Sequence, residues 1–324
     1  MIDLIILIKI IKMTECNCVA QTEPCKIKVL DQHHRVGGNV ELRKTLLETL
    51  TQKTSSSSHC VQFYLGGRQN YKVRKLNPID IEKSKEYCEK YNKSFYIHCP
   101  LIANLSKDPS TKDEKDKSIL KNSWNSVYSE VSQMNGLPAG CVLHVGSRGS
   151  INNLIRNLND FDVPRNRHIN QNKLLLLENA AGQGTSLGRD FDELRKIYEG
   201  IDRNTVGFCL DTQHVFGAGV NSLRTHEDVV KLFDDIQEVT GNNPDVIHLN
   251  DSKKVFGGKV DRHEILGKGY IWYEEDEGLK SLLNICYDQD IDCILETPDN
   301  TRDLNLIRSK YMDLETIDVF KNDL

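Results

Sequence analysis

The chain has 324 residues, of which 38% are hydrophobic and 27% are charged, and its formal net charge is -5 at pH 7. This length allows a large buried core and is ordinary for a single α/β barrel domain. The acidic balance argues against general nucleic-acid-binding character, because such chains usually carry an excess of Lys and Arg. Any contact with DNA must therefore be local.

The amino-terminal residues do not resemble a membrane anchor or a secretory signal. Residues 1–12 are mostly apolar, but a membrane span needs about 20 residues, and the segment has neither a basic start nor a small-residue cleavage site. We therefore predict an N-terminal extension over residues 1–25, with disorder as one interpretation, and no membrane association. Cys16, Cys18 and Cys25 lie there, and a zinc or disulfide role stays open for them, although structural zinc sites usually have four ligands at tighter spacing.

Eight short apolar segments are predicted to be buried strands, and stretches with apolar residues at helical spacing lie between them. The strands are expected at residues 26–30, 60–65, 94–99, 140–145, 173–178, 205–210, 245–249 and 291–296. The helical stretches include 42–50, 79–91, 119–134, 191–198, 229–239 and 279–287. Strands that alternate with helices indicate a parallel sheet, and eight such units indicate one (β/α)8 TIM barrel domain over residues 26–324. The functional groups of such a barrel lie at the C-terminal ends of its strands.

Two polar stretches interrupt this pattern, at residues 51–58 and 106–118, and both are predicted to be solvated loops. The ten cysteines are scattered, and several fall inside predicted strands or helices. We expect these to be buried free thiols and not disulfides. They are Cys60, Cys88, Cys141, Cys209, Cys286 and Cys293.

Six of the predicted strands carry a residue that can bind a metal ion at or just past their last position. These residues are His98, His144, Glu178, Asp211, His248 and Glu296. The sequence D-T-Q-H adds His214 to Asp211, and the sequence D-R-H contributes Asp261 and His263. Residues two apart in an extended segment project to the same side, so Asp261 and His263 can bind one ion.

Nine potential ligands at one end of a barrel suit three metal ions. A lone His or Glu at a strand end is more often a hydrogen-bonded or ion-paired residue, but that explanation weakens for a set of nine. Imidazole and carboxylate ligands without thiolates suit zinc, and also manganese or iron, in a catalytic site. A multi-metal cluster of this kind activates water and holds the attacking and leaving oxygens of a phosphodiester.

The glycine-rich segment 180–188 suggests a different function, because glycines between a strand and a helix can bind phosphate. Its spacing, G-x-G-x-x-x-G, is loose, and the preceding strand ends in Glu178 and Asn179 instead of continuing to the first glycine. Both points argue against a nicotinamide-cofactor site.

Five phrases of the sequence closely resemble the endonuclease IV family of apurinic/apyrimidinic endonucleases. They are L-E-N-A-A-G-Q-G-T-S-L-G (177–188), C-L-D-T-Q-H-V-F-G-A-G (209–219), H-L-N-D-S-K (248–253), V-D-R-H-E-I-L-G-K-G (260–269) and L-E-T-P (295–298). The resemblance covers roughly residues 26–300, and together these phrases are far more specific than any one pattern. It implies a (β/α)8 barrel that holds three Zn²⁺ ions, with Mn²⁺ or Fe²⁺ as alternatives at one or more sites.

Carried over position by position, the resemblance assigns a role to each of the nine residues. The first zinc would be bound by His98 and His144, with Glu178 bridging it to the second. The second ion would be completed by Asp211, His248 and Glu296. The third would be bound by His214, Asp261 and His263. Glu178 and Glu296 are the residues we predict to be catalytic.

The activity that the resemblance implies is hydrolysis of the phosphodiester 5′ to an abasic site in double-stranded DNA. The products would be a 3′-hydroxyl and a 5′-deoxyribose phosphate, and a 3′-phosphodiesterase activity is implied as well. We expect a monomeric enzyme of base excision repair inside the cell, in a compartment that the sequence leaves open.

The loop of residues 66–71 resembles the DNA-penetrating loop of the family, and Arg68 aligns with its inserted arginine. An arginine there could enter the minor groove and help flip the abasic nucleotide out of the stack. A solvated loop arginine is the alternative. The residues expected to contact DNA are Arg68, Gln69, Tyr71, Lys72, Leu101 and Lys253. The basic residues among them would supply local positive charge.

The chain departs from the family pattern at three places. Leu101 stands where the family usually has a Tyr that presses on the DNA, and Val145 replaces the usual proline after His144. The first strand of the family ends in a His before a short Gly-Gly turn, and here His33 or His34 could match. None of these changes removes a predicted metal ligand.

Two other functions remain as alternatives. A sugar isomerase or epimerase on the related barrel that includes xylose isomerase would hold one or two divalent ions at the same strand ends. The D-R-H segment and Arg68 argue against it, because such an enzyme has little use for a third ion or a groove-penetrating loop. The other alternative is a DNA-damage-binding module on an inactive barrel, which the presence of all nine ligands disfavours.

Overall fold

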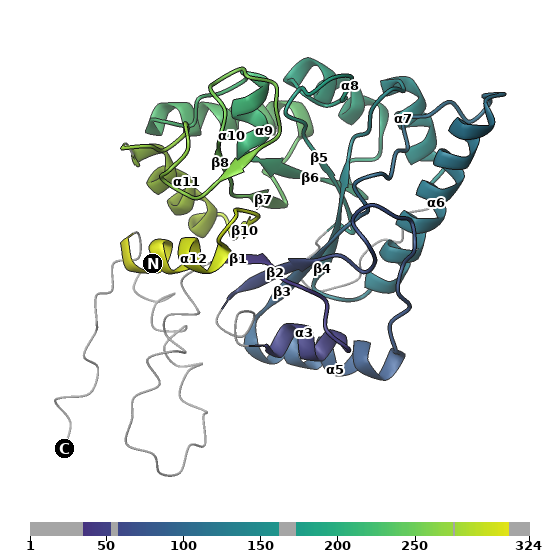
Figure 1. The fold of residues 1–324 in the computed structure, drawn as a ribbon, viewed down its shortest axis with the longest axis horizontal. Helices are drawn as coiled ribbons and strands as arrows, with labels where there is room; N and C mark the ends of the chain where they lie inside the picture. The colour runs from purple at the N-terminus through teal and green to yellow at the C-terminus, as the bar shows by residue number, and fades with distance from the viewer. Residues whose placement is uncertain (1–34, 53–57, 162–172, 275, 311–324) are drawn as a thin grey trace, which may run out of the picture.

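The computed structural model describes residues 35–52, 58–161, 173–274 and 276–310, and these form a closed parallel barrel (Figure 1). The barrel strands are β1 (Val36–Asn39), β2 (Cys60–Phe63), β3 (Ser94–His98), β4 (Ala139–His144), β5 (Leu175–Glu178), β6 (Val206–Asp211), β7 (Val246–His248) and β10 (Asp292–Leu295). Each strand pairs in parallel with its neighbours, and β1 closes the ring between β10 and β2. The predicted (β/α)8 TIM barrel is confirmed.

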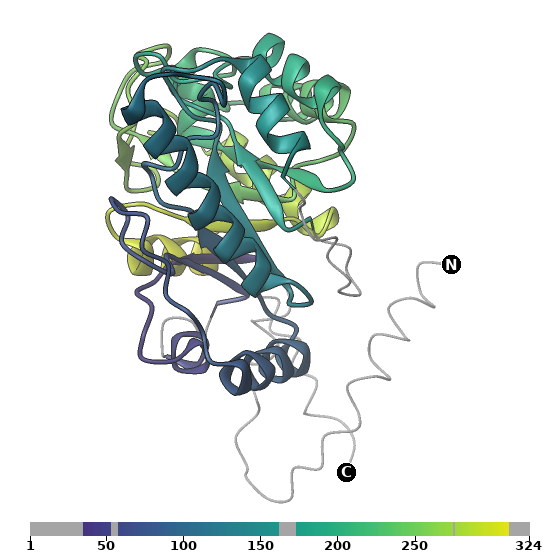
Figure 2. The ribbon, with the colours of Figure 1, turned by 90° about the vertical axis from the view of Figure 1, so that its right-hand side faces the viewer.

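Helices surround the outside of this ring (Figures 1 and 2). They are α3 (Leu46–Thr51), α5 (Pro78–Tyr91), α6 (Glu114–Met134), α7 (Ile151–Asn159), α8 (Phe191–Gly200), α9 (Thr212–Ala218), α10 (His226–Thr240), α11 (Glu277–Asp288) and α12 (Asn300–Lys310). Several begin at an Asn, Asp, Ser or Thr whose side chain accepts a hydrogen bond from a free backbone N–H of the first turn. Such caps fix where the chain leaves a loop and enters a helix.

Two apolar clusters hold the barrel together. The larger lies between the strands and the helices, whereas the smaller takes one side chain from each of seven strands and fills the barrel interior. The interior residues are Cys60, Tyr96, Val142, Leu176, Cys209, Val246 and Ile294. The eighth strand, β1, contributes glycine, because a Cβ on Gly37 would lie 1.6 Å from the carbonyl oxygen of Cys60.

The position of the first strand corrects one expectation. The strand predicted at 26–30 lies outside the described residues, and residues 36–39 take the first place in the barrel. Gly37 and Gly38, expected in a turn, are therefore strand residues, and the side chain at the carboxyl end of β1 is that of Asn39 and not a histidine. Propensity opposes a Gly-Gly strand, but the close approach to Cys60 requires a residue without a side chain.

The loop predicted at 106–118 is also partly wrong. Residues 114–118 form the first turn of α6, because Asp113 caps that helix and Glu114 and Asp116 place negative charge at its amino end. Ser106 and Lys107, at the start of the same stretch, are buried. In the other predicted loop, Thr51 ends α3 and Ser58 is buried, and residues 53–57 lie outside the described part of the chain.

The cysteine prediction holds for the six positions named in strands and helices, all of which are buried free thiols. Cys99 is buried and free as well. Cys16, Cys18 and Cys25, like the rest of the predicted extension at 1–25, lie outside the described residues. Among the helices that the structure describes, none is long and apolar enough to cross a membrane.

Candidate metal centre

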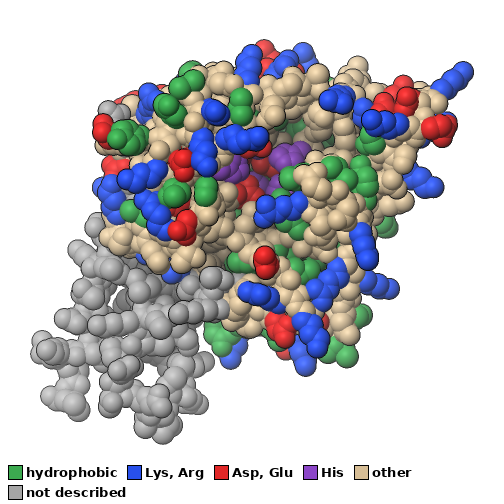
Figure 3. Space-filling view, viewed as in Figure 1, with side chains coloured by type: hydrophobic (Ala, Val, Ile, Leu, Met, Phe, Trp, Pro, Cys, Tyr) green, Lys and Arg blue, Asp and Glu red, His purple; other side chains and the backbone are tan. Residues whose placement is uncertain are grey.

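The predicted ligands lie at the carboxyl ends of consecutive barrel strands. His98, His144, Glu178, Asp211 and His248 are the last residues of β3, β4, β5, β6 and β7, and Glu296 directly follows β10. Parallel register places His144 beside Glu178 and Asp211 beside His248. The result is a hollow in the middle of this face in which histidine and acidic side chains gather, with Lys and Arg around it (Figure 3).

A small second sheet brings in the D-R-H segment. Strand β8 (Asp251–Ser252) continues from β7, and β9 (His263–Glu264) pairs with it so that Ser252 lies opposite His263. The buried Asp251 carboxylate accepts hydrogen bonds from the backbone N–H groups of Gly267, Gly269 and Ile271. This network holds the loop after β9 against β8 and therefore fixes His263 over the barrel.

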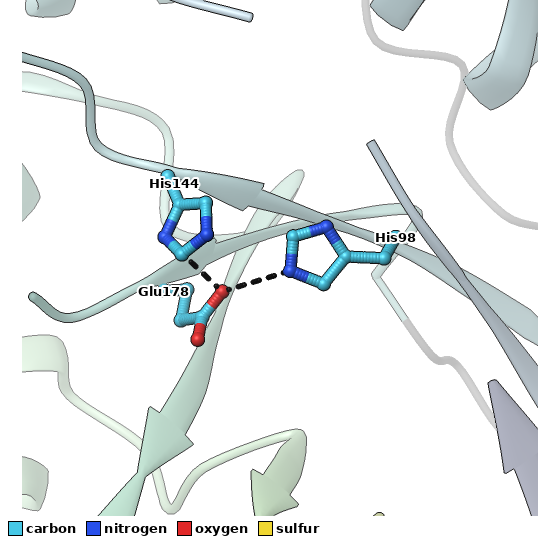
Figure 4. A group of neighbouring side chains, drawn as sticks. All are labelled: His98, His144 and Glu178. Atoms are coloured by element: carbon cyan, nitrogen blue, oxygen red, sulfur yellow. Dashed lines mark ion pairs between the residues drawn. The ribbon is translucent and has the colours of Figure 1, made fainter. Parts of the chain in front are cut away.

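The first group of ligand atoms belongs to His98, His144 and Glu178 (Figure 4). Glu178 Oε2 lies 3.3 Å from His98 Nε2 and 3.4 Å from His144 Nδ1. All three side chains point to one spot from three adjacent strands, as the figure shows. This is the arrangement that the sequence predicted for the first ion.

Three further groups overlap with the first or with one another. One comprises Glu178, Asp211, His248 and Glu296, another comprises His98, His248 and Glu296, and the last comprises Asp211, His214 and His263. Asp261, which was predicted in the third group, lies at its edge, with its carboxylate oxygens 3.4 Å from His214 Nε2 and 3.1 Å from His263 Nε2. All nine predicted ligands therefore meet at one site, and Glu178 and Asp211 are shared between neighbouring groups.

Local structure sets which nitrogen most of the histidines present. His98, His214 and His263 each donate Nδ1–H to a backbone carbonyl, of Cys99, Asn179 and Glu296 respectively. Their Nε2 atoms are left facing carboxylates of the cluster. A metal ligand fixed through its other ring nitrogen is the usual arrangement at histidine metal sites.

The electrostatics of the cluster favour added positive charge. Burial alone would raise the pKa of Glu178, but His144, His248 and His98 outweigh it and hold that pKa well below its usual range. Burial likewise lowers the pKa of His214, yet Asp211, Asp261 and Glu178 raise it to about 10. Within the described residues, the ion pairs of the four clustered carboxylates are all with histidines.

The donor set fits metal ions. Glu178 Oε2, His214 Nε2 and His263 Nε2 are buried atoms without a hydrogen-bond partner, and all of them face the cluster. Buried polar atoms without a partner are costly, and coordination to a cation would satisfy them. Imidazole nitrogens and carboxylate oxygens without thiolates are typical of catalytic zinc sites and also suit manganese and iron.

Buried amides that the sequence analysis did not single out surround the ligands. Asn250 donates to Asp211 Oδ2 over 2.7 Å, and Asn179 binds both the N–H and the carbonyl of Asp211. Asn39 and Gln62 donate to Glu296 Oε1. Asn179 and Asn250 lie one and two positions after predicted ligands, and this spacing could have indicated their place in the site. Gln62 lies in a strand without any predicted ligand, so the sequence offered no such indication for it.

The pocket above the cluster is about 460 Å³ and is lined by ligands together with Tyr64, Arg68, Leu101 and Thr297. The Tyr64 ring stacks on His98 with 5.0 Å between ring centroids, and the Arg68 guanidinium lies 5.0 Å from the Tyr64 ring. The backbone of Leu101 donates to the carbonyl of Arg68. Arg68 and Leu101, both predicted DNA contacts, therefore lie together at the mouth of the pocket.

The other predicted DNA contacts lie outside this pocket. Gln69 and Lys72 are exposed in the loop after β2, and Lys253 is exposed directly after β8. Tyr71 is half-buried, and its hydroxyl donates to the carbonyl of Ile102 over 3.0 Å. That bond ties the loop after β2 to the loop after β3, which is a structural use of Tyr71.

Comparison with known proteins agrees with this geometry. Residues 58–310 match the family model described as a xylose isomerase-like TIM barrel. The chain is 30% identical to the probable endonuclease 4 of Bacillus subtilis (strain 168) over 270 residues, which cover 82% of this chain and 87% of that protein. It is 33% identical over 261 residues to the apurinic-apyrimidinic endonuclease 1 of Plasmodium falciparum, covering 78% of this chain and 42% of that longer protein.

Among solved structures, endonuclease IV from Thermus thermophilus superposes with a TM-score of 0.70 at 25% identity, covering 85% of this chain and 97% of that one. A D-tagatose 3-epimerase-like protein shares the fold, with a TM-score of 0.56 at 19% identity and coverage of 82% and 92%. The class that the fold and the site define is therefore the xylose isomerase-like barrel. Within that class the chain belongs to the endonuclease IV family, so it is a hydrolase of the DNA-repair nuclease type.

Proposed function

We propose that this protein is a zinc-dependent endonuclease that hydrolyses the phosphodiester 5′ to an abasic site in double-stranded DNA. It would leave a 3′-hydroxyl and a 5′-deoxyribose phosphate, and it would also remove blocking groups from 3′ ends as a 3′-phosphodiesterase. The observation that carries the proposal is the sharing of Glu178 and Asp211 between adjoining ligand groups. Shared carboxylates allow three ions to lie side by side, which suits the attacking and leaving oxygens of a phosphodiester.

We propose three ions for these overlapping groups, with the ligands that the family resemblance assigns. His98, His144 and Glu178 would hold the first, Glu178, Asp211, His248 and Glu296 the second, and His214, Asp261 and His263 the third. We expect Zn²⁺ at all three positions, with Mn²⁺ or Fe²⁺ possible at one or more. When bound, such ions lower the pKa of water and stabilise negative charge on a phosphate group.

The side chains of the site hold the proposed catalytic carboxylates in place and keep water away from one side of the pocket. Glu178 and Glu296, the two proposed catalytic carboxylates, are held by histidines and amides on several strands, so neither can turn away from the scissile phosphate. The stacked Tyr64 and His98 rings form one wall of the pocket and keep water from that side. Low water content strengthens every electrostatic interaction inside the site.

We propose that DNA contacts the same face through Arg68, Gln69, Tyr71, Lys72, Leu101 and Lys253. Arg68 and Leu101, which line the pocket, would fill the space that an extruded abasic nucleotide leaves in the duplex. The exposed Lys72 and Lys253 would pair with backbone phosphates. We propose that the protein acts as a monomer.

The deciding experiment uses a duplex with one tetrahydrofuran abasic analogue and a matched undamaged duplex. We expect cleavage 5′ to the analogue with a 3′-hydroxyl product, loss of cleavage on chelation, and recovery on addition of zinc. A Schiff-base lyase would not cut this reduced analogue, so cleavage identifies hydrolysis. Failure of the zinc-loaded protein to cut would reject the proposal. A duplex with a nick that ends in a 3′-phosphoglycolate tests the 3′-phosphodiesterase activity.

A sugar isomerase or epimerase is the remaining alternative, because the shared fold with a D-tagatose 3-epimerase-like protein does not distinguish the two. Metal analysis of the purified protein separates them. Three ions per chain support the nuclease, whereas one ion per chain together with turnover of a ketose would support the sugar enzyme.

A further inference from the structure

Gln62 is a fully buried polar residue that lies among the ligands without being a typical metal ligand. It lies in β2, and its relative exposure is 0%. Its amide oxygen lies 2.9 Å from His248 Nε2, and its amide nitrogen donates to Glu296 Oε1 over 2.8 Å. The same nitrogen donates to Asn39 Oδ1 over 3.3 Å. All the polar contacts of this side chain therefore involve the cluster or its direct neighbour.

The chemistry of these partners permits one orientation of the Gln62 amide. An ionised carboxylate can only accept hydrogen bonds, so the NH₂ group of Gln62 must face Glu296. The amide oxygen must then face His248 Nε2, which has to carry the proton. When the ring carries a single proton, Nδ1 of His248 is therefore left with the lone pair that can bind a metal ion. The Cys209 thiol, which also lies beside this ring, is a weak hydrogen-bonding group and competes poorly for the ring proton.

Nδ1 of His248 faces two carboxylate oxygens. Glu178 Oε1 lies 3.1 Å away and Glu296 Oε2 lies 3.2 Å away. Without a metal ion, a second ring proton on Nδ1 can bond to these oxygens, and in the loaded site a cation takes the place of that proton. Gln62 therefore directs Nδ1 at the position of the second ligand group.

His248 differs in this respect from the histidines that use the backbone. His98, His214 and His263 are oriented through Nδ1 by carbonyls and present Nε2. His248 is oriented through Nε2 by a side chain and presents Nδ1. A side-chain substitution does not remove a backbone carbonyl. Of these four histidines, His248 is therefore the one whose orientation depends on the identity of another residue.

We propose that Gln62 is a positioning residue for the second metal ion: it selects the Nε2–H tautomer of His248 and at the same time holds Glu296. The inference rests on the proposed function only in that it takes the group of Glu178, Asp211, His248 and Glu296 as a metal site. No other residue type of this size offers both groups, since Glu lacks the donor for Glu296 and Met lacks donor and acceptor alike.

The test compares zinc binding and histidine tautomers in the wild-type protein and in Gln62→Met. We expect Gln62→Met to lower the affinity for one of the bound zinc ions by about 10- to 100-fold in chelator competition, the usual effect of removing the partner of a ligand. In ¹⁵N-histidine NMR spectra of the zinc-loaded protein, His248 should show a protonated Nε2 in the wild type and lose that defined state in the variant.

Two matched variants show whether the effect belongs to this position. Gln133→Met removes a half-buried amide that bonds to the backbone of Leu76 far from the cluster, and it should leave zinc affinity unchanged. Asn39→Leu removes a hydrogen bond to Glu296 and one from Gln62, but it keeps the Gln62 oxygen that faces His248, so it should not change the tautomer. Should Gln62→Met fail to fold, Gln62→Glu keeps the oxygen that faces His248 and should keep the Nε2–H tautomer.

The outcomes separate this inference from the proposed function. Unchanged zinc affinity and an unchanged His248 tautomer in Gln62→Met would overturn the inference even in a protein that cuts abasic DNA. A Gln62→Glu protein in which His248 presents Nε2 to the ion would overturn it as well. A loss of zinc affinity confined to Gln62→Met would support it even in a protein that fails to cut abasic DNA.

Discussion

The two ends of the barrel both bury carboxylates, but they neutralise them differently. At the amino end, Asp292 accepts hydrogen bonds from the hydroxyls of Ser94 and Tyr96 and pairs with the Arg35 guanidinium 3.1 Å away. At the carboxyl end, four carboxylates pair with histidines, and none of their ion pairs among the described residues involves Lys or Arg. The amino end is thus balanced by a permanent cation of the chain, and the carboxyl end is arranged for cations from outside.

This difference separates stability from function in a barrel of this kind, where active sites form at the carboxyl ends of the strands. The charge of a carboxylate that pairs with Arg35 is already neutralised by the chain itself. A cluster that lacks permanent cations is destabilised by repulsion until ions bind. The predictions below test that contrast, from the largest expected effect to the smallest.

Glu178→Gln should have the largest effect, because it removes the carboxylate that two ligand groups share. We expect incision of abasic DNA to fall by about 1,000-fold or more, equivalent to ~4 kcal/mol of transition-state stabilisation, with loss of bound zinc. Single-turnover incision and metal analysis measure both. Asp292→Asn makes the same chemical change at the amino end and should leave incision per folded molecule unchanged. Incision by Glu178→Gln within tenfold of the wild-type rate would contradict the proposed difference between the two ends of the barrel.

Asp292→Ala should instead lower stability. It leaves the Arg35 guanidinium partly buried without its main partner, and removal of one member of a buried pair typically costs about 3–5 kcal/mol. Urea unfolding of the zinc-loaded protein measures this loss. Zinc content should stay at the wild-type value, and a variant that unfolds like the wild type but loses zinc would contradict the division between the two ends.

Removal of zinc should destabilise the wild-type protein through the carboxyl end alone. A ligand at a free concentration of 100 times its Kd stabilises a folded protein by about 2.7 kcal/mol per site. Calorimetry with and without a chelator should therefore show a lower melting temperature without zinc. Asp292→Asn should show the same zinc-dependent shift as the wild type, and Glu178→Gln a smaller one. Equal shifts in all three proteins would show that zinc acts elsewhere.

Glu130 on α6 is a third kind of buried carboxylate. Its substitution has the smallest predicted effect. Its exposure is 1%, and no ion pair involving it is found among the described residues. Burial raises its pKa from 4.5 to about 7, although Cys99 and His98 act in the opposite direction. The folded state therefore keeps this proton more tightly than the unfolded state, so stability is highest below about pH 4.5 for this group and falls as the pH rises towards 7.

Glu130→Gln should remove this pH dependence. Relative to the wild type, the variant should gain about 2 kcal/mol of unfolding free energy between pH 5 and pH 8, because one pKa unit corresponds to about 1.4 kcal/mol. Urea unfolding of both proteins at the two pH values measures the difference. Parallel pH profiles would mean that Glu130 ionises normally and that burial alone does not decide the behaviour of these carboxylates.

Much of the site follows from local sequence. A ligand at the end of each apolar segment predicts a ring of ligands once the segments are parallel strands of a barrel. Spacing of two residues predicts that Asp261 and His263 approach each other, and their side chains are 3.1 Å apart. Spacing of three places Asp211 and His214 together because Asp211 caps α9 and accepts a hydrogen bond from the backbone of His214.

Tertiary structure decided the parts that depend on distant partners. Residues 36–39 carry too few apolar side chains to be recognised as a strand, yet they pair with β10 and β2. Glycine is required there because a Cβ at Gly37 would collide with the backbone of Cys60. The Tyr71 hydroxyl binds a carbonyl of the neighbouring loop, a contact that no pattern in the sequence indicated. Gln62 and His248 are 186 residues apart, so no periodicity links them. Patterns in a sequence report which face a residue occupies within its own element, whereas the partner that a buried amide meets is set by closure of the barrel.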